Sequence, residues 1–135
     1  MTGTQINVRK RKRRPAPTDE LALETAWRLN ALVYWLSGAE FKLVHHILSA
    51  TLLNGRWRVS LSYNEIRNGV DDKRGRIGGV NMCASSIITS MRSLIERGLV
   101  TKHQSNGRVP NAYAINIDGL HALVRERVPE ALQPK

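Results

Sequence analysis

Apolar residues near the start of the chain recur at steps of three or four positions, which is the spacing of one face of an α-helix. This spacing predicts a first helix over residues 19–36, with a buried stripe of Leu21, Thr25, Leu29, Leu32 and Leu36. Residues 32–36 are apolar almost all round, and a helix of this kind needs contacts on two sides. Two interpretations stay open: the segment packs in the core of its own chain, or Leu32, Trp35 and Leu36 form a homodimer interface.

Two serine–glutamate pairs with three-residue spacing predict where further helices begin. In Ser37-Gly38-Ala39-Glu40 and in Ser62-Tyr63-Asn64-Glu65, the serine and the glutamate can each accept a hydrogen bond from the backbone amide of the other, which is a capping box. The first box predicts a helix that ends near Leu53, and the second predicts a short helix that ends at Gly69.

The middle of the chain combines a short strand, a charged loop and a third amphipathic segment. Residues 57–61 have the composition of a short strand. Residues 69–80 are rich in glycine and charge, and we expect a loop whose length indicates a functional insertion between two helices. The next helix is expected over residues 82–97, with buried positions at Ile87, Met91, Leu94 and Ile95.

The last part of the chain predicts a hairpin and a final helix. Gly98 fits the left-handed position that ends a helix, and Leu99 follows it into the core. Strands are expected over residues 100–104 and 112–117, because Ser105-Asn106-Gly107-Arg108 between them has the residues that tolerate a tight turn. A helix over residues 118–128 completes the pattern.

The distribution of charge changes this picture more than its sum. The chain carries a net charge of +10 over 135 residues. Residues 1–18 and 55–110 contribute +6 each, residues 19–54 contribute −2, and residues 111–135 are neutral. A field this positive attracts polyanions, and the plainer interpretation is a solvated surface that keeps the protein soluble.

The N-terminal 18 residues are polar and basic, so we expect a disordered arm before a single domain over residues 19–135. The functional interpretation is an arm that follows DNA phosphates or enters a minor groove. A nuclear-localisation signal and a loose solvated tail are the alternatives. The arm contains an unbroken basic run of Arg9, Lys10, Arg11, Lys12, Arg13 and Arg14.

The order of a capped helix, a second helix ending in Glu96-Arg97-Gly98-Leu99-Val100, and a hairpin ending in Asn111-Ala112-Tyr113-Ala114-Ile115-Asn116 resembles winged helix-turn-helix DNA-binding domains. It is similar to those of bacterial, phage and plasmid regulators and replication-initiation proteins. The resemblance covers roughly residues 39–117, with the helix-turn-helix over 62–97 and the wing over 99–117. It implies a mainly α fold with a small β-hairpin, here with an extra N-terminal helix.

The resemblance makes residues 82–97 a recognition helix whose first two turns enter the major groove. Its small polar and methyl-bearing side chains can meet base edges and phosphates, and Arg92 alone can make a bidentate contact to guanine. The alternative is that these are simply exposed polar positions. The candidate DNA-binding residues of this helix are Ala84, Ser85, Ser86, Thr89 and Arg92, with Ile88 on the same face.

Two further groups of residues are expected to contact DNA. The wing would bring Asn106, Arg108 and Lys102 to the minor groove or the backbone, unless it is a solvated hairpin. The charged loop would clamp the backbone, although Asp71 and Asp72 partly neutralise it. Its candidate residues are Lys73, Arg74 and Arg76.

Enzyme chemistry has little support in the sequence. Gly75-Arg76-Ile77-Gly78-Gly79 lacks the lysine and hydroxyl residue that complete a phosphate-binding loop. The four histidines and the single cysteine, Cys83, do not have metal-ligand spacing, so neither a metal nor a cofactor is expected. The lone cysteine fits a reducing compartment, and no apolar run is long enough to span a membrane.

The sequence therefore predicts a non-enzymatic, homodimeric protein that binds double-stranded DNA and regulates transcription in the cytoplasm, at the nucleoid. A plasmid or phage replication or partition factor that binds origin repeats is an alternative, with a protein partner in replication or transcription. An architectural protein that coats DNA is another. A winged helix used as a protein-interaction module is the last.

Overall fold

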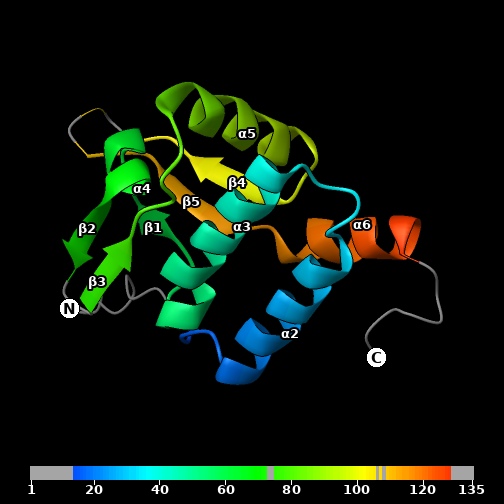
Figure 1. Ribbon diagram of the computed structural model, residues 1–135. Coiled ribbons are helices and arrows are strands. Elements are labelled where there is room, and N and C mark those ends of the chain that lie inside the picture. Colours follow the sequence, from blue (N-terminus) through cyan, green and yellow to red (C-terminus); the bar gives the residue numbers. More distant parts are fainter. Residues whose placement is uncertain (1–13, 73–74, 106, 108, 129–135) are drawn as a thin grey trace, which may run out of the picture.

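The computed structural model describes residues 14–72, 75–105, 107 and 109–128, and these form a helix-rich mixed α/β structure (Figure 1). The described residues contain five α-helices and a short 3-10 turn, η1. Their bounds are α2 (Asp19–Ala31), α3 (Gly38–Ala50), η1 (Leu52–Asn54), α4 (Tyr63–Asn68), α5 (Ala84–Glu96) and α6 (Ile117–Arg127).

Two small antiparallel sheets complete the described fold. One sheet has the strand order β1-β5-β4, with β1 (Val59–Ser60), β4 (Val100–His103) and β5 (Ala112–Ile115). The other is a hairpin of β2 (Gly69–Asp72) and β3 (Gly75–Gly78). Strands β4 and β5 are consecutive in the chain, whereas β1 comes from the segment before α4 and pairs with β5.

Helix α2 is shorter than the periodicity predicts. Thr18 caps its start, since the Thr18 hydroxyl accepts a hydrogen bond from the Leu21 amide at 3.1 Å. The helix expected to reach residue 36 ends at Ala31, and residues 32–35 form turns. Leu32 and Leu36 are 0% and 8% exposed. The apolar run is thus explained by a turn that buries both leucines in the core of the same chain.

Helix α3 crosses the middle of the molecule between α2 and α5 (Figure 1). The expected capping box at its start is confirmed: the Ser37 amide donates to Glu40 Oε1 at 2.8 Å, and the Glu40 amide donates to Ser37 Oγ at 3.0 Å. The α-helix ends at Ala50, before the predicted end, because residues 52–54 tighten into η1. Fully buried side chains of α3 include Leu43, Val44 and Ile47, and each buried apolar side chain contributes about 1.5–3 kcal/mol.

The second capping box, Ser62 with Glu65, is also confirmed and starts α4. The loop expected over residues 69–80 is instead the β2–β3 hairpin, in which Val70 pairs with Ile77. The hairpin forms because buried Ile77 anchors it, and because the segment after β3 closes α4. The Val80 amide donates to Ile66 O at 2.9 Å, and the Asn81 amide donates to Arg67 O at 3.2 Å.

Helix α5 lies across α3, and its C-terminus leads into β4. Gly98 takes a φ of 79° there, as predicted for the residue that ends this helix, and the Leu99 amide donates to Leu94 O at 3.0 Å. The two strands expected over residues 100–104 and 112–117 are confirmed as β4 and β5, although they end at His103 and Ile115. Helix α6 packs on α2 through buried residues that include Leu120 and Val124.

Candidate nucleic-acid interface

The exposed side of α5 carries small polar side chains, as the sequence predicts. Ile87, Met91 and Leu94 are buried in the core, and Ser90 is buried with them. Ser86 is half-buried. The side chains on the exposed face are Ala84, Ser85, Ile88, Thr89, Arg92 and Glu96. The face therefore offers one guanidinium, two hydroxyls and three side chains with methyl groups. Glu96, at its far end, adds a carboxylate that was not among the predicted residues.

The N-terminus of α5 begins at Ala84, with Cys83 as the N-cap residue. The exposed Cys83 thiol does not cap a backbone amide but contacts Ser86 Oγ at 3.2 Å and Ser85 Oγ at 3.4 Å. Hydrogen bonds from Ser85 and Ser86 to the thiolate lower the pKa of Cys83 to about 7. The start of this helix thus carries an ionisable thiol among hydroxyl groups.

A buried carboxylate fixes the other end of α5 to α3. Glu40 Oε2 accepts a hydrogen bond from Arg97 Nε at 3.1 Å and another from the Ser93 hydroxyl. Burial raises the pKa of Glu40, but the hydrogen bonds from Ser93 and Ser37 and the charge of Arg97 outweigh it, and the net pKa lies below its usual value. The capping box of α3 is therefore also the anchor of α5.

The side chains of β4 alternate between the two faces of the β1-β5-β4 sheet. Val100 and its cross-strand partner Ile115 are buried on the face toward α3 and α5. Lys102 alternates with Thr101 and shares the face of Val100, so it lies on the α5 side of the sheet. Asn106 and Arg108, the wing-tip candidates, lie outside the described residues.

Arg76 is engaged within its own hairpin rather than beside α5. Its Nη2 donates to Asn68 O at 3.0 Å, at the C-terminus of α4, and its Nη1 donates to Asp71 Oδ1 at 3.3 Å. In Figure 1 the hairpin runs from the end of α4 away from α5. The structure thus places Arg76 on the β2–β3 hairpin and not next to α5, and its contact with DNA stays a prediction. Lys73 and Arg74 lie outside the described residues.

The last part of the basic arm is docked on the domain, which corrects the disorder expected up to residue 18. Trp57 Nε1 donates to Pro15 O at 2.7 Å, and the Arg14 guanidinium lies 3.5 Å from the centre of the Trp57 ring. Pro17 is buried. Arg9, Lys10, Arg11, Lys12 and Arg13 lie outside the described residues. No feature of the sequence around Trp57 identified it as the docking point.

The residues proposed for a dimer interface are mostly unavailable to a second chain. Leu32 and Leu36 are buried within the protomer, and Trp35 is partly buried. Dimerisation through the two leucines is therefore wrong for this structure. The exposed apolar side chains on and just after α2 are Leu23, Trp27, Val33 and Tyr34, of which Tyr34 is 88% exposed.

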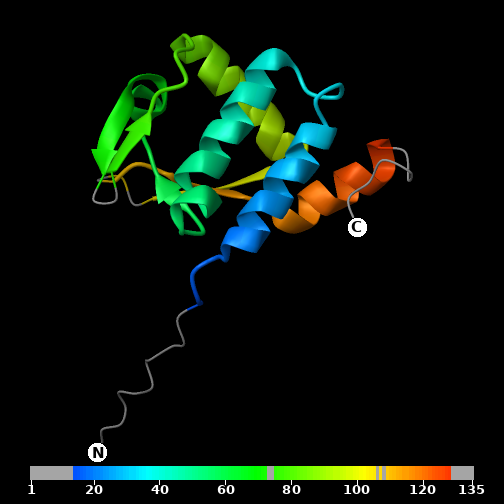
Figure 2. The same ribbon diagram turned by 60° about the horizontal axis from the view of Figure 1, so that its bottom comes forward.

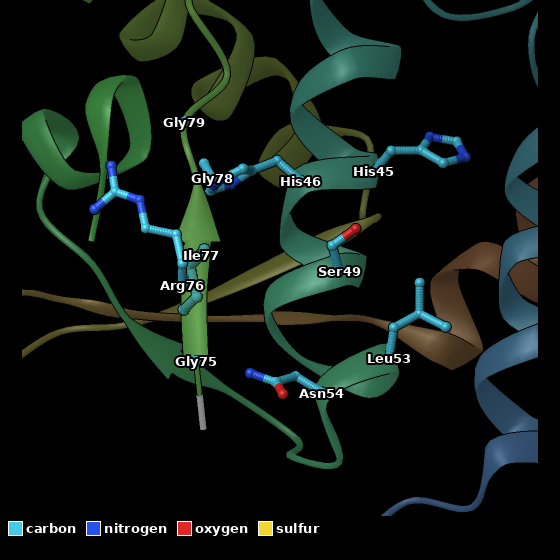
Figure 3. Close-up of a pocket in the computed structure, with 10 residues that line it drawn as sticks. All are labelled: His45, His46, Ser49, Leu53, Asn54, Gly75, Arg76, Ile77, Gly78 and Gly79. Carbon is cyan, nitrogen blue, oxygen red and sulfur yellow. The ribbon is translucent and has the colours of Figure 1, made fainter. Parts of the chain in front are cut away.

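A pocket of about 420 Å³ lies between α3 and β3, and its lining residues are labelled in Figure 3. The adjacent histidines point in different directions, as expected for neighbours on a helix. His46 turns to the hairpin, where its Nε2–H donates to Gly78 O at 2.7 Å, whereas His45 Nδ1 contacts Phe41 O at 3.0 Å. Burial lowers the pKa of His46, which stays neutral and holds the hairpin to α3.

Metal-ligating groups do not converge in the part of the chain that the structure describes: no three histidine, cysteine, aspartate or glutamate side chains are arranged to hold a metal ion. Among these same residues, no helix has the length and apolar character to cross a membrane. Comparisons with protein-family models, curated proteins and solved structures found no match.

Proposed function

We propose that this chain is a winged helix-turn-helix protein that binds duplex DNA and regulates transcription, with α5 as its recognition helix. The order α3–β1–α4–α5–β4–β5 and the sheet order β1-β5-β4 support the winged-helix assignment. In this assignment α4 and α5 are the helix-turn-helix, β4 and β5 form the wing, and α2 is the additional N-terminal helix. The β2–β3 hairpin is then an insertion between the two helices of the motif.

The observation that carries the proposal is the exposed face of α5. A helix that only packs on a core needs no particular chemistry on its outer face, whereas a groove-reading helix needs donors, acceptors and methyl groups of small size. Ser85 and Thr89 supply hydroxyls, Ala84 and Thr89 supply methyl groups for thymine, and Arg92 supplies a bidentate donor for guanine. Lys102 lies on the same side of the sheet and can contact a phosphate of that duplex.

The remaining charge supports binding to a polyanion. Six consecutive basic residues precede the domain, and each phosphate that a cation contacts adds about 0.9 to the slope of log K against log salt. Because α5 offers only one cation for base contacts, direct readout by this helix is modest, and phosphate contacts supply a large share of the affinity.

The test is selection of bound duplexes from a random DNA pool at moderate salt, followed by sequencing. Enrichment of a palindrome supports a dimeric regulator, and enrichment of a directional repeat supports a replication or partition factor instead. Retention without sequence enrichment would favour an architectural protein. Loss of all retention would overturn DNA binding and favour a protein-interaction module.

A pair of matched variants assigns the result to α5. Arg92→Gln removes the exposed cation of α5, and Arg125→Gln removes an exposed cation of α6. We expect Arg92→Gln to change the enriched sequence at one position, whereas Arg125→Gln leaves the enriched sequence as in the wild type. Identical enrichment by both variants would overturn the assignment of α5.

A further inference from the structure

We propose that the protein has a second DNA-binding surface on the face of the β1-β5-β4 sheet that points away from α5, so that one molecule holds two duplex segments. This inference rests on the proposed function, because it takes α5 as the first DNA-binding surface. It goes beyond that function because it assigns Arg14 and the outer face of the sheet to a different segment of DNA. We call this surface the sheet groove.

Small side chains lie on this outer face of the sheet, and two of them, Thr101 and Ala114, line the hollow of the sheet groove. Thr101 pairs with Ala114 across β4 and β5, and Ser60 pairs with Ala112 across β1 and β5. By the two-residue alternation of strands, these four residues share the face opposite Val100 and Tyr113. The hollow over this face has a volume of about 760 Å³, and its lining includes Arg14, Trp57, Arg58, Thr101, His103 and Ala114.

The wall of the groove presents a preorganised guanidinium. Arg14 lies 3.5 Å from the centre of the Trp57 ring, and Trp57 is itself tied to the backbone of the arm by its hydrogen bond to Pro15 O. Stacking uses the flat face of a guanidinium, while its N–H donors point outward in the plane and remain able to bind phosphate oxygens. The contact thus fixes a cation without using up its donors.

The charge of the groove is complementary to a phosphate backbone. Exposed Arg58 stands next to Trp57 in the chain and, within the described residues, takes no part in an ion pair. Asp118 is the one carboxylate among the residues that line the groove. In the sequence, five more basic residues lead directly into Arg14. Arg14 and Arg58 are the cations on which the proposed surface rests.

The groove and α5 face opposite sides of the molecule. In Figure 2 the sheet is seen nearly edge-on, with α3 and α5 above it and residues 14–18 leaving below it. Figure 1 also has α5 and the start of α2 at opposite ends. A straight duplex held against α5 therefore cannot lie in the sheet groove as well. A second segment of duplex DNA is the occupant that fits both the charge and the direction of this surface.

The test is a bridging assay with the full chain. The protein is loaded on a bead-bound duplex of mixed sequence, free protein is washed away, and a fluorescent duplex is added. We expect the wild type to capture the fluorescent duplex. The double variant Arg14→Gln/Arg58→Gln should stay on the beads but capture the fluorescent duplex less tightly, and its slope of log K against log salt for this second duplex should fall by about 1.8. The matched control is Arg125→Gln/Arg127→Gln, which removes the same charge from α6 and should capture as the wild type does.

Three outcomes would count against the proposal, and they differ in what else they overturn. A wild type that is not retained on the beads would overturn DNA binding itself. A wild type that is retained but captures no second duplex would overturn only the sheet groove. Capture that is equally strong in both double variants would also overturn it, because bridging would then come from a second protomer or another surface.

Discussion

Arg97 Nε, at the C-terminal end of α5, donates a hydrogen bond of 3.1 Å to Glu40 Oε2 in the first turn of α3. Glu40 is 5% exposed, and the Ser93 hydroxyl also donates to this oxygen. The second carboxylate oxygen accepts the Ser37 amide. One side chain thus caps the central helix and fixes the direction of the helix that we propose to read DNA.

We expect Glu40→Gln to lower the free energy of unfolding by about 2 kcal/mol, because a buried site built for a charged acceptor loses its charge. For a domain of this size that corresponds to a melting temperature lower by roughly 8 °C. Thermal unfolding measures the melting temperature, and urea unfolding measures the free energy of unfolding. Glu126→Gln is the control, since Glu126 is an exposed residue of α6. Equal stability of the two variants would contradict the anchoring role of Glu40.

The same residue predicts a dependence of stability on pH. The folded pKa of Glu40 lies below its unfolded value, so the unfolded state binds a proton first as the pH falls. Its contribution is fully present above the unfolded pKa, near 4.5, and is lost as the pH falls through the lowered folded pKa. In urea titrations the wild type should lose more stability than Glu40→Gln over this acidic window. Parallel curves would show that the carboxylate is not specifically stabilised.

Gly79 lies where the segment after the β2–β3 hairpin packs closely against the backbone of α4, so a larger residue there tests this packing. A Cβ on Gly79 would lie 2.3 Å from Arg67 O, whereas a Cβ on Gly78 would have no atom within 4 Å. We therefore expect Gly79→Ala to destabilise the fold by about 1–3 kcal/mol through overpacking against backbone. Gly78→Ala should stay near the wild type in chemical unfolding. A reversed order would mean that the hairpin does not close on α4.

Short-range signals explain which parts of this fold were predictable. Both capping boxes were found because serine and glutamate stand three residues apart, and the end of α5 was found because Gly98 has the required conformational freedom. The end of α2 was not predicted, because the spacing of apolar residues continues unchanged through the turn that follows the helix. Leu32 and Leu36 both reach the core, so the apolar pattern continues after the helix has stopped.

Long-range contacts explain what the sequence could not show. The partners of Glu40 in α5 lie 53 and 57 residues away, and Trp57 meets Pro15 across 42 residues. The β2–β3 hairpin was missed for a related reason. Only Val70 and Ile77 are apolar in its strands, so alternation is too short to detect, and the hairpin is held by the carbonyl groups of α4 and by His46.

Because of His46, we expect the free energy of unfolding to fall in mildly acidic solution. Burial lowers its pKa, and its Nδ1 has no hydrogen-bond partner among the described residues. Because the folded pKa lies below the unfolded value of 6.5, the unfolded state binds the proton first, and stability falls as the pH drops below 6.5. We expect His46→Gln to lose less stability than the wild type between pH 7 and pH 5, as measured by urea unfolding.

His121 is the comparison residue, because burial lowers its pKa as well, with help from the charge of Arg28. It shows how much of the loss of stability is not specific to the β2–β3 hairpin. His121→Gln should also reduce the total loss of stability. Hydrogen exchange separates the two residues, once each rate is divided by the intrinsic exchange rate at the same pH. The protection factors of the amides of β2 and β3 should fall on acidification when His46 is present and not when it is replaced. Protection factors of the hairpin that do not change on acidification would contradict the role of His46 in holding it.

Cys83 gives a direct probe of the start of α5, because it is the single cysteine of the chain and is exposed. Hydrogen bonds from Ser85 and Ser86 lower its pKa to about 7, and the thiolate is the reactive form. The rate of alkylation should therefore reach half its maximum near pH 7. In Ser85→Ala/Ser86→Ala this midpoint should move toward that of an ordinary thiol, about 8.5.

Added duplex DNA extends the same measurement to the proposed interface. If the first turn of α5 enters a groove, bound DNA covers Cys83 and slows its alkylation at a fixed pH. A duplex that the sequence selection enriches should protect more strongly than an unrelated duplex at moderate salt, because only specific binding seats α5 against the bases. Equal alkylation rates with and without a duplex that is known to be bound would mean that the DNA lies elsewhere. That result would remove α5 from the interface, and with it the first surface on which the two-duplex inference rests.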